Sequence, residues 1–240
     1  MITRHPAESR GRTDIDWLDS WHSFSFGDYH DPAMMGFRAL RVINDDRVAA
    51  GQGFGTHAHR DMEILTYVLD GALAHKDSLG NGETLRPGEV QVMTAGRGIE
   101  HSEFNPSRTE PVHLYQIWLK PREKGLRPAY GQKAFEASGR SDTWQRVASG
   151  TPNGSGIGSN ADGALTINTD ADVLIASIAP GRESAYTLRA GRRAWVQVLR
   201  GKVELNGVAL AEGDGASVSD VANLNVRGID QAEVMLFDLA

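Results

Sequence analysis

The chain has 240 residues, of which 40% are hydrophobic and 23% are charged, a composition typical of a globular protein with a buried core. It contains no cysteine, which excludes disulfide bridges, thiolate metal ligands, iron–sulfur clusters and cysteine nucleophiles. With 25 basic and 31 acidic residues the net charge is −6, so we expect no direct nucleic-acid partner and no membrane partner.

The N-terminal segment lacks the apolar stretch of a secretory signal, and Glu8, Asp14 and Asp16 argue against a transit peptide. No apolar run approaches the roughly 18 residues that a membrane-spanning helix needs. The longest, Val173–Ala179, has the length of a strand. The sequence therefore predicts a cytoplasmic protein.

Alternating apolar residues predict β-strands in the first half of the chain. Helix is expected only in short pieces, such as Asp14–Trp21 with Asp14 as its cap. Asp-Gly, Asn-Gly and Pro-Gly pairs, together with 27 glycines and 9 prolines overall, indicate tight turns between the strands. The predicted strands cover Phe37–Asn44, Met62–Leu69, Glu89–Met93 and Val112–Leu119.

The alternation is lost over residues 121–141, which we interpret as the crossing between two domains, 1–136 and 137–240. Residues 149–163 are richer in Gly and Ser and offer another place for a boundary. Because Trp144–Ala148 has the pattern of a strand, we favour a long mobile hairpin loop there instead.

The second half repeats the pattern of the first. TYVLDGALAH at 66–75 and VQVLRGKVEL at 196–205 each contain a β-rich run, a charged residue with Gly, and another run. Asn206-Gly207 is a strong hairpin signal, because both central residues of the tight turn take positive φ. The fold class that we predict is all-β, with two barrels or sandwiches in tandem.

The distribution of histidines limits where an imidazole metal site can form. The eight histidines are at positions 5, 22, 30, 57, 59, 75, 101 and 113, and none lies in the last 127 residues. Only the first half can therefore supply a histidine metal site.

His57 and His59 would lie on one face of a strand, and His101 and Glu103 repeat the same spacing. If the two strands are neighbours, the four side chains converge inside the barrel. A divalent cation would offset the cost of a carboxylate in an apolar interior. Three nitrogens and one oxygen suit first-row transition metals. By itself, one His-x-His pair is better explained by exposed polar residues on an edge strand.

We interpret the other histidines as structural. His5 is expected in a frayed terminus, and His22 and His30 as packing or surface groups. His75 heads a predicted turn. His113 lies on the strand after the candidate ligands, where a hydrogen-bonded sheet histidine is the favoured interpretation over a cavity-lining one.

Two groups of residues resemble the motifs of the cupin superfamily. Gly51, His57, His59, Glu63 and Gly71 match the first motif, with one extra residue before Gly71. Gly88, Gly96, His101 and Asn105 match the second, in which Thr94 replaces a proline and two residues are inserted before His101. Together with the segments FSFGD at 24–28, FRALRV at 37–42 and MTAGRGIEHSE at 93–103, the chain resembles the pirin family, densely over residues 20–120.

This resemblance implies two tandem cupin barrels of the jelly-roll type, with a metal site in the N-terminal barrel only. The implied ligands are His57, His59, His101 and Glu103, and the implied cofactor is one divalent transition metal, with Fe(II) favoured and Ni, Co, Mn, Cu or Zn as alternatives. Glu63 would either support His59 or form a rim ion pair with Arg60 or Arg97.

The resemblance also implies quercetin 2,3-dioxygenase activity, with a small aromatic substrate and O2. Glu103 would take the 3-hydroxyl proton of a flavonol, and ring opening would release carbon monoxide. Two alternatives remain open: a metal-dependent regulator that binds a protein partner, and a cupin oxygenase or isomerase for another small molecule. We expect a monomer.

Overall fold

The computed structural model describes residues 1–150 and 162–240, and most of the loop predicted at 149–163 lies outside these residues. The described chain is almost entirely β-strand, with two short 3₁₀ helices, η1 (Ala7–Ser9) and η2 (Ala137–Arg140). The predicted all-β fold class is thus confirmed. None of the helices in the described residues has the length and apolar character needed to cross a membrane.

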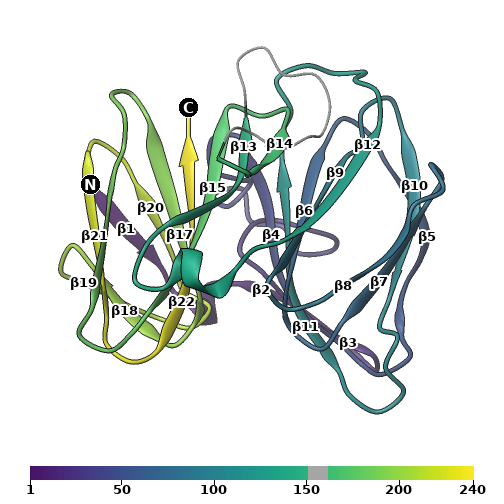
Figure 1. The fold of residues 1–240 in the computed structure, drawn as a ribbon, viewed down its shortest axis with the longest axis horizontal. Helices are drawn as coiled ribbons and strands as arrows, with labels where there is room; N and C mark the ends of the chain where they lie inside the picture. Colours follow the sequence, from purple (N-terminus) through teal and green to yellow (C-terminus); the bar gives the residue numbers. More distant parts are fainter. Residues whose placement is uncertain (151–161) are drawn as a thin grey trace. The chain divides into compact units, whose positions relative to one another are not determined.

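The chain forms two compact units (Figure 1). The first unit consists of Gly11–Phe135 with Gly150–Thr169, and the second of Met1–Arg10, Glu136–Ser149 and Asp170–Ala240. Each unit is therefore discontinuous in sequence, since the first ten residues belong with the C-terminal part of the chain.

The first unit contains two antiparallel sheets. The larger has the strand order β12-β9-β6-β11-β4-β3-β2, and the smaller has the order β5-β10-β7-β8. The strands of this unit are β2 (Gly11–Ile15), β3 (Leu18–His22), β4 (Leu40–Val48), β5 (Gly53–His59), β6 (Glu63–Asp70), β7 (Leu73–Asp77), β8 (Gly82–Leu85), β9 (Glu89–Thr94), β10 (Ile99–Phe104), β11 (Val112–Leu119), β12 (Ala129–Ala134) and β14 (Leu165–Ile167).

The interior of the first unit is divided by a row of polar residues. Val48, Val68 and Leu114 belong to one apolar cluster, and Ile64 and Met93 to another. Between them, one inner-face residue from each of five adjacent strands forms a line across the larger sheet, and all five are buried. This polar row consists of Gln91, Thr66, Gln116, Asn44 and His22.

The second unit repeats this arrangement. Strands β1, β20, β17, β22, β15 and β13 follow one another in one sheet, and β16, β21, β18 and β19 form another. The order of this smaller sheet corresponds, strand by strand, to the order β5-β10-β7-β8 in the first unit. The strands of this unit are β1 (Ile2–His5), β13 (Gln145–Gly150), β15 (Ala171–Ile178), β16 (Glu183–Thr187), β17 (Arg193–Arg200), β18 (Lys202–Leu205), β19 (Val208–Ala211), β20 (Gly215–Val218), β21 (Asn223–Gly228) and β22 (Ala232–Leu239).

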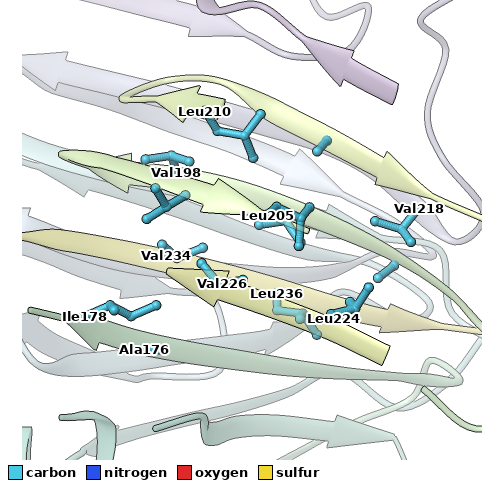
Figure 2. Close-up of a cluster of buried hydrophobic side chains, with 14 of the residues drawn as sticks. Ala176, Ile178, Val198, Leu205, Leu210, Val218, Leu224, Val226, Val234 and Leu236 are labelled. Carbon is cyan, nitrogen blue, oxygen red and sulfur yellow. The ribbon is translucent and has the colours of Figure 1, made fainter. Parts of the chain in front are cut away.

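The core of the second unit is apolar. Figure 2 shows Val198 of β17, Leu205 of β18, Leu224 and Val226 of β21 and Leu236 of β22 in one cluster, and all are buried. The repeat seen in the sequence reappears as β6 followed by β7 and β17 followed by β18. Each pair is joined by a glycine with positive φ, Gly71 at 78° and Gly201 at 73°.

Two predictions near the N-terminus were wrong. The segment 14–21 is a β-hairpin rather than a helix, because Leu18, Ser20 and His22 are buried while the residues between them are less so, which is the period of a strand. The residue His5 is not frayed. It ends β1, whose residues pair with β20, and its ring stacks on Trp195 at 4.8 Å.

Candidate metal centre

Three neighbouring strands of the small sheet bring the candidate ligands together. In the register between β10 and β5, His101 lies opposite His57, and Ile99 lies opposite His59. On the other side of β10, Glu103 lies opposite His75 of β7. Since alternate residues of a strand point to one face, these pairings place imidazoles and a carboxylate on the inner side of the sheet.

His57, His59 and His101 form one compact group. Their ring centroids are 4.4 to 4.8 Å apart, and one ligand nitrogen of each lies within 4.8 Å of the others. Burial, followed by the neighbouring His57, lowers the pKa of His59 to about 4. Burial, followed by His57, His59 and His75, lowers the pKa of His101 to about 2. The rings of His59 and His101 are thus uncharged at neutral pH, as metal binding requires.

Glu103 belongs to a second, overlapping group with His75 and His101, within the same 4.8 Å limit. The four residues predicted as ligands therefore fall into two sets that share His101. His57, His59 and Glu103 do not offer three ligand atoms that all lie within 4.8 Å of one another. Among the described residues these two sets are the groups of three or more side chains that could hold a metal ion.

Two buried atoms at this site have no hydrogen-bond partner: His101 Nε2 and Glu103 Oε1. The other carboxylate oxygen, Oε2, accepts a hydrogen bond from Gln116 Nε2 at 2.7 Å. Burial raises the pKa of Glu103 to about 7, although this hydrogen bond acts to lower it. Unpaired buried donors and acceptors are costly, and a divalent cation bound by nitrogen and oxygen ligands would satisfy both atoms. The residues present thus fit a first-row metal.

His75 was not identified from the sequence as part of this site. It is buried within β7, its Nδ1 lies 3.4 Å from His101 Nδ1, and its Nε2 lies 3.5 Å from Asp77 Oδ2. The sequence did contain a signal, because His75 and Asp77 have the same i, i+2 spacing as the other pairs. The carboxylate of Asp77 is itself fixed by the backbone amides of Leu79 and Asn81.

A cavity of about 340 Å³ opens beside the candidate ligands, within the size range of small-molecule sites. His57, His59 and Glu103 contribute to its wall. Phe26, Phe54 and Trp118 supply aromatic surface, and the Trp118 ring stands edge-on to His59 at 4.9 Å. The remaining lining residues are Thr13, Leu18, Ser20, His22, Gly27, Asp28, Asn44, Asp46 and Gln116.

Of the other singled-out residues, Glu63 and His22 have different positions from those expected, whereas His113 does not. Glu63 is fully buried and supports neither His59 nor a rim ion pair, because its carboxylate accepts from Thr94 Oγ1 at 2.9 Å and from the backbone amide of Asn168 at 3.0 Å. His22 lines the cavity. His113 bonds Asp45 at 2.7 Å as a sheet histidine, as the sequence indicated.

Comparison with known proteins gives one consistent family. The family model described as pirin matches residues 4–119, and the model described as quercetinase C-terminal cupin domain matches residues 157–239. The quercetin 2,3-dioxygenase of Escherichia coli strain K12 is 47% identical over 240 residues, covering 100% of this chain and 99% of the relative. A pirin-like protein of Caulobacter vibrioides is 42% identical over the full length of both.

Solved structures agree with these relatives. The crystal structure of the bacterial pirin YhhW from Escherichia coli in complex with nickel(II) has a TM-score of 0.91 and 46% identity, covering 100% of this chain and 99% of that one. The N-terminal match contains every candidate metal ligand of this chain. The cupin model over 157–239 agrees with the predicted second cupin domain.

Proposed function

The chain belongs to the pirin family, and from this premise we propose that it is a metal-dependent dioxygenase that opens the heterocyclic ring of a flavonol such as quercetin. The observation that carries the proposal is the pair of unpartnered buried atoms, His101 Nε2 and Glu103 Oε1, in a ligand cluster beside a cavity of suitable size. The name of the Escherichia coli quercetin 2,3-dioxygenase and the nickel complex of the Escherichia coli pirin support it.

His57, His59, His101 and Glu103 are the residues that would hold the metal. When bound, a divalent first-row metal supplies Lewis acidity that favours the ionised form of a phenol. We favour Fe(II), with nickel as the leading alternative, because a relative binds that ion. His75, in contact with His101, would help to orient that ring.

Glu103 is the proton acceptor in this proposal. Gln116 holds Oε2, so Oε1 is the oxygen that would serve both tasks: it would bind the metal, and when released from the ion it would take the 3-hydroxyl proton of a flavonol in the cavity. The aromatic side chains of Phe26, Phe54 and Trp118 would pack against the planar rings and exclude water. In the balanced reaction one O2 is consumed, both of its atoms enter the depside product, and C3 leaves with its oxygen as carbon monoxide.

The test combines elemental analysis with turnover. Protein reconstituted with Fe(II), Ni(II), Co(II), Mn(II) or Cu(II) is expected to take up oxygen and bleach quercetin with at least one of these ions. We expect His101→Ala to abolish both signals, because it removes the residue that the two ligand sets share. His113→Ala is the matched control, because His113 lies in the same unit but bonds Asp45 instead of the ligand cluster.

Unchanged quercetin absorbance with every metal, in protein shown to contain the ion, would contradict the proposal. Such a result would favour a metal-dependent regulator that acts through a protein partner. If His101→Ala is as active as His113→Ala, the metal site does not take part in the reaction.

A further inference from the structure

The cavity has a second polar region, formed by strands other than those of the candidate metal ligands. Ser20 and His22 lie on β3, and Asn44 and Asp46 lie on β4. The register pairs Ser20 with Asp46 and His22 with Asn44, so all four side chains project from the same face of the larger sheet. All four are buried, and all four line the cavity.

Hydrogen bonds fix these side chains in place. His22 Nδ1 bonds Asn44 Oδ1 at 2.8 Å, and His22 Nε2 bonds Thr13 Oγ1 at 2.9 Å. The Ser20 hydroxyl donates to Asp46 Oδ1. Each bond uses only one end of Asn44 and Asp46. Asp46 Oδ2 and the Asn44 side-chain nitrogen have no hydrogen-bond partner among the described residues.

These two atoms face the cavity and are not enclosed by protein, so a ligand that displaces solvent there must offer them hydrogen-bond partners. Asp46 Oδ2 is an acceptor and the Asn44 amide nitrogen is a donor, so together they match a phenolic hydroxyl group, which both donates and accepts. Burial raises the pKa of Asp46 to about 7, so Oδ2 accepts a hydrogen bond while the group is ionised and donates one when it is protonated, and a phenolic hydroxyl can pair with either form. The aromatic side chains of Phe26, Phe54 and Trp118 line the same cavity and suit the ring that would bear such a hydroxyl.

We propose that Asn44 and Asp46, with Asp46 oriented by Ser20, form a subsite that hydrogen-bonds hydroxyl groups on the outer phenyl ring of the flavonol. The substrate class is thereby narrowed to flavonols that are hydroxylated on that ring. The inference rests on the proposed function, since it requires a flavonol in the cavity. It assigns binding of the outer ring to Asn44 and Asp46, which are not candidate metal ligands.

The experiment uses three flavonols that differ only in that ring: galangin with no hydroxyl, kaempferol with one and quercetin with two. Binding to the full-length protein is measured by quenching of tryptophan fluorescence, with and without metal, because Trp118 lines the cavity. We expect quercetin to bind roughly ten-fold more tightly than galangin, as one or two added hydrogen bonds predict. The same preference should be present in the metal-free protein.

Asp46→Ala should reduce this preference to within about two-fold, mainly by weakening quercetin binding. Asp45→Ala is the matched control: it removes a carboxylate from the adjacent position of β4, where Asp45 bonds His113 instead of lining the cavity. Asn44→Ala provides a second variant if Asp46→Ala does not fold, and it should lose the same preference.

Equal affinities of the wild-type protein for galangin and quercetin would overturn the subsite while leaving the proposed function intact, provided that quercetin is turned over. An unchanged preference in both Asp46→Ala and Asn44→Ala would also overturn it. If no flavonol binds or is turned over, the proposed function itself fails and the inference fails with it.

Discussion

Gln116 controls how Glu103 is presented to the cavity. Its amide nitrogen donates to Glu103 Oε2 at 2.7 Å, while its own oxygen accepts from Trp118 Nε1 at 3.3 Å. An indole nitrogen can only donate, so this contact fixes which end of the Gln116 amide faces Glu103. Gln116 thus pairs with Oε2 of Glu103, and Oε1 has no hydrogen-bond partner.

Gln116→Leu should therefore weaken metal binding by roughly 10- to 100-fold, the usual effect of losing a group that orients a ligand. The leucine leaves Glu103 Oε2 without a donor, so the carboxylate rotates and competes less well for the ion. The measurement is a titration of metal-free protein against a chromophoric chelator. Gln197→Leu is the control, since Gln197 of the second unit is also buried and also accepts from an indole nitrogen, that of Trp195 at 3.2 Å. Equal affinities in the two variants would show that Gln116 does not position Glu103.

Candidate ligands could be predicted from sequence only where neighbouring positions encode them. His57 and His59, or His101 and Glu103, are two residues apart, and strand alternation is enough to place each pair on one face. His75 was missed although it has the same spacing from Asp77, because its proximity to Glu103 depends on the pairing of β7 with β10, which the spacing does not reveal. The partner of Glu63 was missed for the same reason, because Asn168 is 105 residues away.

At the level of the strand, the packing of β5 against β10 depends on Gly53. A Cβ atom on this residue would lie 2.2 Å from the backbone oxygen of Glu103 and 2.6 Å from the Cα of Phe104. On Gly55, two residues along the same strand, a Cβ atom would meet nothing within 4 Å. The close approach of the two ligand-bearing strands thus requires glycine at only one of these positions.

We expect Gly53→Ala to destabilise the protein by roughly 1–3 kcal/mol, a cost typical of overpacking, and to displace β5 from β10. Gly55→Ala should be close to wild type in the same urea titration. Metal affinity should fall in Gly53→Ala alone, because His57 and His59 lie on β5 while His101 and Glu103 lie on β10. Similar unfolding midpoints for both variants would contradict this account of the strand contact.

Strand positions followed from the sequence where apolar alternation was regular. Val112–Leu119 coincides with β11, whereas the strand predicted at Phe37–Asn44 lies at Leu40–Val48. The difference arises because Phe37 and Leu40 bond each other in a tight turn, with Arg38 at a φ of 57°. The C-terminal half of this strand was also missed because Asn44–Arg47 is polar. Asn44 and Asp46 face the cavity, and apolar alternation cannot identify strand residues of this kind.

At the level of the whole molecule, the two units share a strand order but differ in their interior. The repeat aligns His75 with Leu205, and the register that pairs His75 with Glu103 pairs Leu205 with Val226. Leu224 then corresponds to His101. Leu205, Leu224 and Val226 all lie in the apolar core of the second unit (Figure 2). Hydrocarbon thus replaces imidazole and carboxylate at matching positions, which explains why the second unit lacks this ligand set.

The division of the chain at 136/137 remains a prediction, and truncation tests it. A fragment 1–136 lacks Asn168, whose amide bonds the buried Glu63, and it lacks β20, the partner of β1. We expect it to be poorly soluble and inactive. A fragment 11–169 keeps the Glu63 contacts and should give the higher thermal midpoint and the higher soluble yield. A soluble, active fragment 1–136 would contradict this expectation.

The pairing of β1 with β20 also affects biosynthesis. Ile2 lies opposite Val218, so β1 cannot pair with its neighbour until more than 200 further residues have been translated. Contacts of such long sequence separation form late, because closing the intervening loop costs entropy. During synthesis, β1 therefore has an unpaired strand edge until β20 is made, which places it among the segments where chaperones would act.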